Sequence, residues 1–197
     1  MILTILLICF AYLLGSIPTG LLLSKALAGV DPRQKGSRNI GATNVMRTVG
    51  KALGAVTLLG DVLKGLIPVL LALWLRQEQA WVAAVALAAF LGHCFPIYLR
   101  FKGGKGVATA LGIFLPLAPL AVLMAIVVFA TGVAITRMVS VGSIAAAGAI
   151  PLLIWLRGYP VSFILLGICV GAIIIHRHKE NIQRLLMGKE NKIWGGS

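Results

Sequence analysis

The sequence predicts an all-α integral membrane protein with seven transmembrane helices, one of them short, folded as a single domain over residues 1–197. Hydrophobic side chains make up 59% of the chain, charged ones only 12%, and the mean hydropathy is +1.00. Such a chain has too few polar side chains to cover a soluble globule of its size. Apolar runs long enough to cross a hydrocarbon core of ~30 Å recur along the whole length, and most basic residues fall between them.

The first apolar run, Met1 to Ser24, is predicted to be a retained span and not a cleaved signal peptide. Its positive charge follows the apolar stretch, at Lys25, whereas a signal peptide carries positive charge ahead of a shorter apolar core. The basic segment Lys25 to Lys51 should lie in the cytoplasm, so the amino terminus is expected outside.

The segment Lys35 to Lys51 combines hydroxyl, amide and guanidinium groups and has no acidic residue. This set suits a small polyol phosphate, because Arg grips phosphate as a fork while Ser and Asn hydrogen-bond hydroxyl groups. An ordinary solvated loop, the alternative, would more often carry Glu, Asp and Lys. The candidate substrate-binding residues here are Ser37, Arg38, Asn39, Asn44 and Arg47, and the last two share one face of a helical turn.

The next two runs, Ala52 to Leu75 and Ala80 to Leu99, carry ionisable side chains inside predicted spans. Isolated charges at mid-span cost about 2.5 to 3.5 kcal/mol each on insertion scales, so we expect Asp61 and Lys64 to pair. A buried structural ion pair is at least as good an interpretation as a chemical role. His93 is likewise interpreted as a hydrogen-bonded structural residue.

A basic, glycine-rich turn, FKGGKG at residues 101–106, precedes a predicted short helix from Val107 to Leu115. The free N–H groups and positive dipole end of that helix make a preformed anion site. Glycine at 103, 104 and 106 allows the backbone to approach phosphate oxygens, and Lys105 adds a charge. The Walker A spacing is absent. A flexible basic loop is the alternative.

The run from Val107 to Thr136 is predicted to be two helices with a turn at LPLAP, residues 115–119. As a single span it would leave the basic tail outside, against the positive-inside rule. Two helices place Arg137 inside, Arg157 outside and the carboxyl terminus in the cytoplasm. The last two spans are Met138 to Leu156 and Val161 to Ile175.

Two further polar clusters follow. Arg137, Ser140 and Ser143 stand at the opening of the sixth helix, where packing by small residues is an alternative explanation for the two serines, and only Arg137 and Ser143 are retained as site candidates. His178, Asn181 and Arg184 lie in the tail among apolar residues, where an interfacial anchor helix is the alternative.

Three motifs, GSRNIGATNVMR, GHCFP with LRFKGGKGVATALG, and HKENIQRLLMGKE, together resemble the PlsY family of bacterial acyl-phosphate:glycerol-3-phosphate acyltransferases. The resemblance spans the whole chain and implies one transmembrane acyltransferase domain. The implied reaction moves a fatty acyl group from acyl phosphate to the 1-hydroxyl of glycerol 3-phosphate, giving lysophosphatidic acid and phosphate, the first step of membrane phospholipid synthesis. The implied location is the bacterial plasma (inner) membrane, with the active site on the cytoplasmic side. The resemblance implies no metal, cofactor, nucleic acid or obligatory protein partner.

The resemblance also implies roles for particular positions. Glu190 would be structural. Substrate binding is assigned to the candidates of the first motif and to Gly103, Gly104, Gly106, Arg137, Ser143 and Arg184. The catalytic residues would be His178, Asn181 and Lys105. Acyl phosphate is already activated, so we expect direct attack by the C1 hydroxyl without an acyl-enzyme. The general base is left open between His178 and a substrate phosphate.

Two other classes of function are weaker. A transporter of organic phosphates would use half-helices aimed at anions but usually shows an internal repeat, and the glycine–lysine turn has no second copy. A structural subunit that contacts anionic lipids would not explain so many Asn, Ser, Arg and His residues on one side. The net charge of +13 is explained by membrane orientation without nucleic acid.

Overall fold

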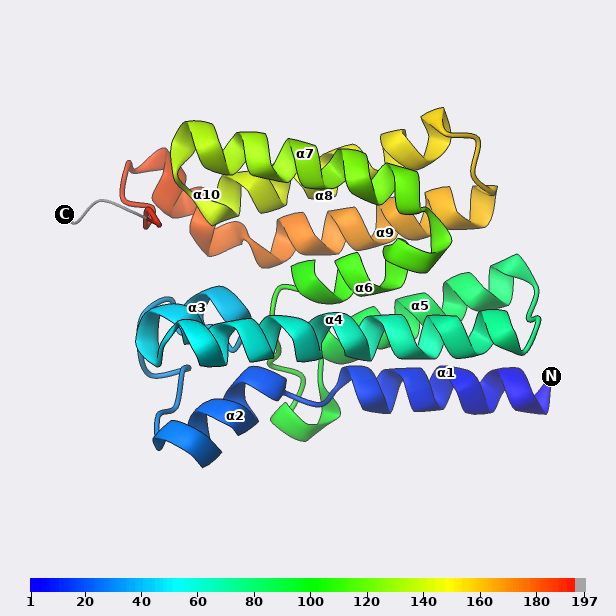
Figure 1. The fold of residues 1–197 in the computed structure, drawn as a ribbon, viewed down its shortest axis with the longest axis horizontal. Coiled ribbons are helices and arrows are strands. Elements are labelled where there is room, and N and C mark those ends of the chain that lie inside the picture. The colour runs from blue at the N-terminus through cyan, green and yellow to red at the C-terminus, as the bar shows by residue number, and fades with distance from the viewer. Residues whose placement is uncertain (194–197) are drawn as a thin grey trace. The chain divides into compact units, whose positions relative to one another are not determined.

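The computed structural model describes residues 1–193, and every regular element in this part of the chain is a helix, as Figure 1 shows. The all-α prediction is therefore confirmed. Two compact units form, the first from Met1 to Pro116 and the second from Leu117 onward. A single domain over residues 1–197 stays a prediction.

The first unit begins with a broken span. Pro18 divides the first apolar run into α1 (Ile2–Gly15) and α2 (Thr19–Ala28). Proline has no N–H for the helical ladder and its ring clashes with the preceding turn, so the single helix expected from Met1 to Ser24 does not form. The two pieces still make one candidate span of 27 residues.

The rest of the first unit supplies two long helices and the segments around them. Its elements are α3 (Ala42–Thr48), α4 (Lys51–Trp74), α5 (Gln79–Cys94), the 3₁₀ turn η1 (Ile97–Leu99) and α6 (Val107–Leu117). Helix α1 packs against α5 at backbone distance, because a Cβ on Gly15 would collide with the carbonyl of Ala89, and one on Gly92 with that of Tyr12. Small residues allow such close approach in membrane helices.

The second unit contains α7 (Pro119–Thr136), α8 (Val139–Leu156), α9 (Val161–Arg177) and α10 (Lys179–Leu186). Helix α8 packs against both α7 and α9. Gly142 meets the carbonyl of Phe129, and Gly171 meets that of Ala147, so small residues again bring backbones together. Helices α9 and α10 meet at a bend of 56°.

The apolar run from Val107 to Thr136 breaks, as predicted, near LPLAP. The break falls at Ala118, whose φ of −148° and ψ of 62° lie outside the helical region because Pro119 follows it. Helix α6 therefore has 11 residues and continues to Leu117, two residues past the predicted end.

Five helices of the described residues are long and apolar enough to cross a membrane, or six if the bent pair α9 and α10 is one span. Large apolar side chains on them are exposed, including Leu59 at 58%, Leu123 at 59% and Leu165 at 60%, as expected where lipid replaces water. A multi-pass membrane protein is confirmed at this level. The count of seven spans stays a prediction.

Candidate active site

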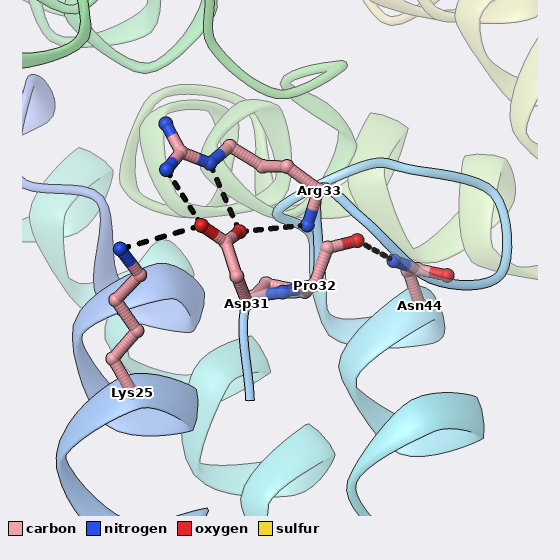
Figure 2. A network of polar contacts seen from close by, with 5 residues as sticks. All are labelled: Lys25, Asp31, Pro32, Arg33 and Asn44. Carbon is pink, nitrogen blue, oxygen red and sulfur yellow. Dashed lines mark hydrogen bonds and ion pairs between the residues drawn. The ribbon is translucent and has the colours of Figure 1, made fainter. Parts of the chain in front are cut away.

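The loop between α2 and α3, residues 29–41, is tied at its start by Asp31. This carboxylate accepts hydrogen bonds from the backbone N–H of Arg33 at 3.0 Å and from its Nε and Nη2 at 3.0 and 2.7 Å. Lys25 Nζ lies 3.3 Å from the same carboxylate (Figure 2). The hydrogen bonds from Arg33 hold the pKa of Asp31 well below its ordinary range, so the carboxylate stays ionised.

Asn44, on α3, holds the rest of this loop. Its Oδ1 accepts the Ser37 N–H at 2.8 Å, and its Nδ2 is directed at the carbonyls of Pro32 and Asn39, each at 2.8 Å, and of Lys35 at 3.2 Å. The side chain is 2% exposed. Figure 2 shows it reaching from α3 to Pro32. The carboxamide expected to contact substrate is therefore engaged with the loop backbone.

The other candidates of the first motif cluster around this anchor. Ser37 and Asn39 are half-buried, and Arg38 and Arg47 are exposed. Arg38 has a φ of 55°, a left-handed conformation that a local turn must hold. Loop and α3 thus bring together all five residues predicted from the sequence, with Asn44 inside and the others nearer the surface.

The glycine segment, Gly103–Gly106, follows α5 and leads into α6. The N–H of Gly103 donates to the Cys94 carbonyl at 3.2 Å, and that of Gly104 donates to the His93 carbonyl at 3.1 Å. These two amides are therefore engaged with the end of α5, which differs from the expectation that they wrap a phosphate. Neither residue has room for a Cβ against His93. The first-turn amides of α6 and the Lys105 ammonium are the groups of this segment best suited to an anion.

The ion pair predicted in the second span forms. Lys64 Nζ lies 2.8 Å from Asp61 Oδ1, and both side chains are buried. His93 joins the pair, with Nδ1 3.6 Å from the same oxygen. All three side chains are buried, and His93 lies directly against Gly103 and Gly104.

A second polar cluster lies in the second unit around the Glu190 carboxylate. Asn181 Nδ2 and Ser140 Oγ donate to its Oε1 at 2.6 and 2.8 Å, and Arg184 Nε donates to its Oε2 at 2.7 Å. Burial works to raise the pKa of Glu190, but the hydrogen bonds from Asn181, Arg184 and Ser140 outweigh it and lower that pKa. Ser140 was not among the predicted site residues.

His178 stands at the bend between α9 and α10 and is 3% exposed. Its Nδ1 lies 2.8 Å from the Ile174 carbonyl. A carbonyl oxygen only accepts, so Nδ1 carries a proton in this contact, and Nε2 is the acceptor nitrogen in the neutral form of the ring. Ser143 is buried on α8. Arg137 is exposed, with a φ of 61°, and its carbonyl accepts the Ile193 N–H at 2.8 Å.

Comparison with known proteins gives consistent matches over the whole chain. A family model described as glycerol-3-phosphate acyltransferase matches residues 5–188. The glycerol-3-phosphate acyltransferase of Geotalea daltonii is 56% identical over 187 residues, 95% of this chain and 96% of the relative. That of Geobacter sulfurreducens is 56% identical over 182 residues, 92% of this chain and 93% of the relative.

Two solved structures also match, both of PlsY (YgiH), an integral membrane glycerol 3-phosphate acyltransferase. The glycerol 3-phosphate form has a TM-score of 0.93 and 43% identity, and covers 97% of this chain and 96% of that one. The lysophosphatidic acid form has a TM-score of 0.91 and 43% identity, and covers 97% of this chain and 95% of that one.

Proposed function

Because the chain belongs to the glycerol-3-phosphate acyltransferase family, we propose that it transfers a fatty acyl group from acyl phosphate to the 1-hydroxyl of glycerol 3-phosphate. The products are lysophosphatidic acid and inorganic phosphate. The observation that carries the proposal is the family match over nearly the whole chain, together with solved relatives in forms named for glycerol 3-phosphate and lysophosphatidic acid. A transporter of organic phosphates is not favoured by any of these matches.

The chemistry is a direct acyl transfer. The C1 oxygen of glycerol 3-phosphate attacks the acyl carbonyl carbon, the bond from that carbon to the phosphate oxygen breaks, and the hydroxyl proton passes to a base. Phosphate leaves readily, so no acyl-enzyme is required. Alignment of the two substrates alone supplies ~7 to 11 kcal/mol of barrier reduction when the reacting atoms are held in place.

The first unit holds phosphate groups in this proposal. Lys105 and the amino-terminal amides of α6 supply positive charge and donors, and Ser37, Arg38 and Arg47 supply a hydroxyl and two guanidinium groups. Asn39 lies with Ser37 in the loop that Asn44 braces. The role of Asn44 is to set the path of that loop.

The second unit supplies the base. His178 has Nδ1 directed at a carbonyl and therefore a basic Nε2, which is the arrangement a general base needs. Asn181 and Arg184 are oriented by Glu190. Arg137 and Ser143 add a guanidinium and a hydroxyl to the substrate-binding set.

We also infer the setting of the enzyme. Seven spans, counting α6, place the amino terminus outside and the basic tail in the cytoplasm of a bacterial inner membrane. The polar loops that carry the site then face the cytoplasm, where glycerol 3-phosphate is soluble, and the acyl chain lies in lipid. No cofactor, metal or partner protein enters the proposed reaction.

The test is donor specificity. Purified protein in detergent is given palmitoyl phosphate and glycerol 3-phosphate, and in parallel palmitoyl coenzyme A and glycerol 3-phosphate, with lysophosphatidic acid measured by mass spectrometry. Product from the first pair alone is expected. Lys105→Ala should abolish it, whereas Lys102→Ala, a change at an exposed lysine of the same basic turn, should retain it. Equal product from both donors, or none from acyl phosphate, contradicts the proposal.

A further inference from the structure

Three titratable side chains lie in the interior of the first unit and take no part in the proposed reaction. Asp61 is 2% exposed, His93 4% and Lys64 5%. Two nitrogens face one oxygen, Asp61 Oδ1, with Lys64 Nζ at 2.8 Å and His93 Nδ1 at 3.6 Å. Lys64 also donates to the Ile17 carbonyl at 2.9 Å, at the break between α1 and α2. Buried charges are costly, so their placement calls for a reason beyond stability.

The side chain of Asp61 contacts His93, and His93 in turn contacts the glycine segment, Gly103–Gly106. The His93 carbonyl accepts the Gly104 N–H at 3.1 Å. The imidazole itself lies against Gly104 so closely that a Cβ at this position would collide with Nε2. The ring is thus held between the Asp61 carboxylate and Gly104, and a rotation of the ring would displace the segment.

The backbone of Asp61 contacts the helix that follows the same segment, α6. Its carbonyl accepts the hydroxyl of Thr109 at 3.0 Å, and Thr109 is fully buried in the first turn of α6. One turn further along α4, Gly65 lies so close to α6 that a Cβ there would be 2.6 Å from the Thr109 carbonyl. One residue therefore contacts both supports of the glycine segment, His93 before it and Thr109 after it.

We propose that Asp61 is a positioning residue that fixes the glycine segment, Gly103–Gly106, from both ends while touching no substrate. This inference rests on the proposed function, in which Lys105 and the start of α6 hold a phosphate group. Loss of either support lets the segment move, and the donors for that phosphate lose their alignment.

The first experiment measures the segment directly. Asp61→Leu combined with Lys64→Met removes the carboxylate without leaving an unpaired ammonium, and Thr109→Val removes only the second support. Hydrogen–deuterium exchange of the amides of residues 103–109 in detergent should become about tenfold faster in each, the change that loss of one hydrogen bond brings. Thr57→Val is the matched control, because this buried threonine of α4 donates only within its own helix, to Leu53.

The second experiment measures function. In both variants the inhibition constant of inorganic phosphate and the KM of one phosphate substrate should rise about tenfold, with the other KM unchanged. Exchange at residues 103–109 that matches Thr57→Val overturns the positioning role. Faster exchange with no change in phosphate inhibition or either KM supports positioning by Asp61 but overturns phosphate binding at the segment. If the double variant does not fold, Thr109→Val tests the support from the Asp61 carbonyl, and Asp61→Asn, which keeps the shape of the side chain, tests the support from the carboxylate.

Discussion

Asn44 and Ser37 are seven residues apart in sequence, and the 2.8 Å hydrogen bond between them fixes the path of the chain from α2 to α3. The same carboxamide is directed at the carbonyls of Pro32, Lys35 and Asn39. A loop of this length would otherwise leave buried backbone groups without partners. Asn44 therefore sets the path of the loop that carries Ser37 and Asn39.

Asn44→Ala should loosen this loop. Removal of the carboxamide leaves buried donors and acceptors unsatisfied, at a cost of about 1 to 3 kcal/mol. Limited trypsin digestion is expected to cleave after Arg33, Lys35 or Arg38 about tenfold faster than in the wild type, because cleavage follows the open population.

Thr48→Val is the control for this change. Its hydroxyl donates to the Asn44 carbonyl within α3, and valine keeps the methyl group that lies beside Gly36 of the loop. Its cleavage rate should stay at the wild-type value, and equal rates for the two variants would show that the carboxamide does not hold the loop.

His178→Ala should lower kcat by about 10² to 10⁴, the range for a lost general base, with smaller changes in KM. His176→Ala, at an exposed histidine two residues earlier, should retain wild-type kcat. Steady-state rates of phosphate release from palmitoyl phosphate measure both. A His178→Ala enzyme that keeps most of its kcat while KM rises would assign the proton to a substrate phosphate.

For single residues, the sequence identified the chemically unusual side chains. It was less successful at predicting which groups each of them contacts. The Asp61–Lys64 pair followed from the cost of isolated charges in a span, and it forms. The contacts of Asn44 and Ser140 could not be predicted, because each depends on a partner brought near by the fold. Asp31 carried a signal that was missed, since Asp followed by Pro and Arg is typical of a side-chain-capped turn.

Among the elements, α10 shows most clearly how a short helix is held in place. Asn181 and Arg184 on α10 and Ser140 on α8 all donate to Glu190, which lies beyond the end of α10. The carboxylate thus fastens a helix of eight residues that could not persist alone.

The lowered pKa of Glu190 predicts acid sensitivity of this unit. A carboxyl group whose folded pKa is lowered contributes stability that is present above its unfolded pKa and is lost as the pH falls through the folded value. The thermal midpoint in detergent should therefore fall more steeply below the ordinary glutamate range in the wild type than in Glu190→Gln. Parallel curves would mean that the carboxylate adds no stability through its charge.

A helix break was predictable where charge parity required it, and a proline alone was not enough. The break near Pro119 was predicted to within a few residues, because the basic carboxyl-terminal tail had to end on the cytoplasmic side of the membrane. The break at Pro18 was missed, since the apolar pattern continues through it. Helix α10 was considered only as an interfacial anchor and α3 only as a single helical turn, because helices this short show little periodicity.

For the molecule as a whole, with the bent pair α9 and α10 counted as one span, the choice between six and seven spans depends on α6. Its 11 residues reach ~16 Å at 1.5 Å per residue, about half a hydrocarbon core. If α6 crosses, Arg157 lies outside and the tail inside. If α6 does not cross, Arg157 lies inside and the tail outside.

Cysteine labelling separates the two arrangements. In a variant without its native cysteines, single replacements Gln34→Cys, Arg157→Cys and Lys189→Cys are treated in intact cells with a membrane-impermeant maleimide. We expect label at 157 alone, and label at 34 and 189 only after the cells are permeabilised. Label at 189 but not at 157 in intact cells would exclude α6 as a span.

The hydrogen bond from Lys64 to the Ile17 carbonyl has a consequence for biogenesis. The kinked first segment leaves the ribosome before α4, so an acceptor is already in place when the ammonium enters the bilayer. Asp61, three residues earlier on the same helix, arrives with it and nearly cancels its charge. Lys64 therefore enters the bilayer with its counter-charge on the same helix and with a hydrogen-bond acceptor already present in the earlier segment.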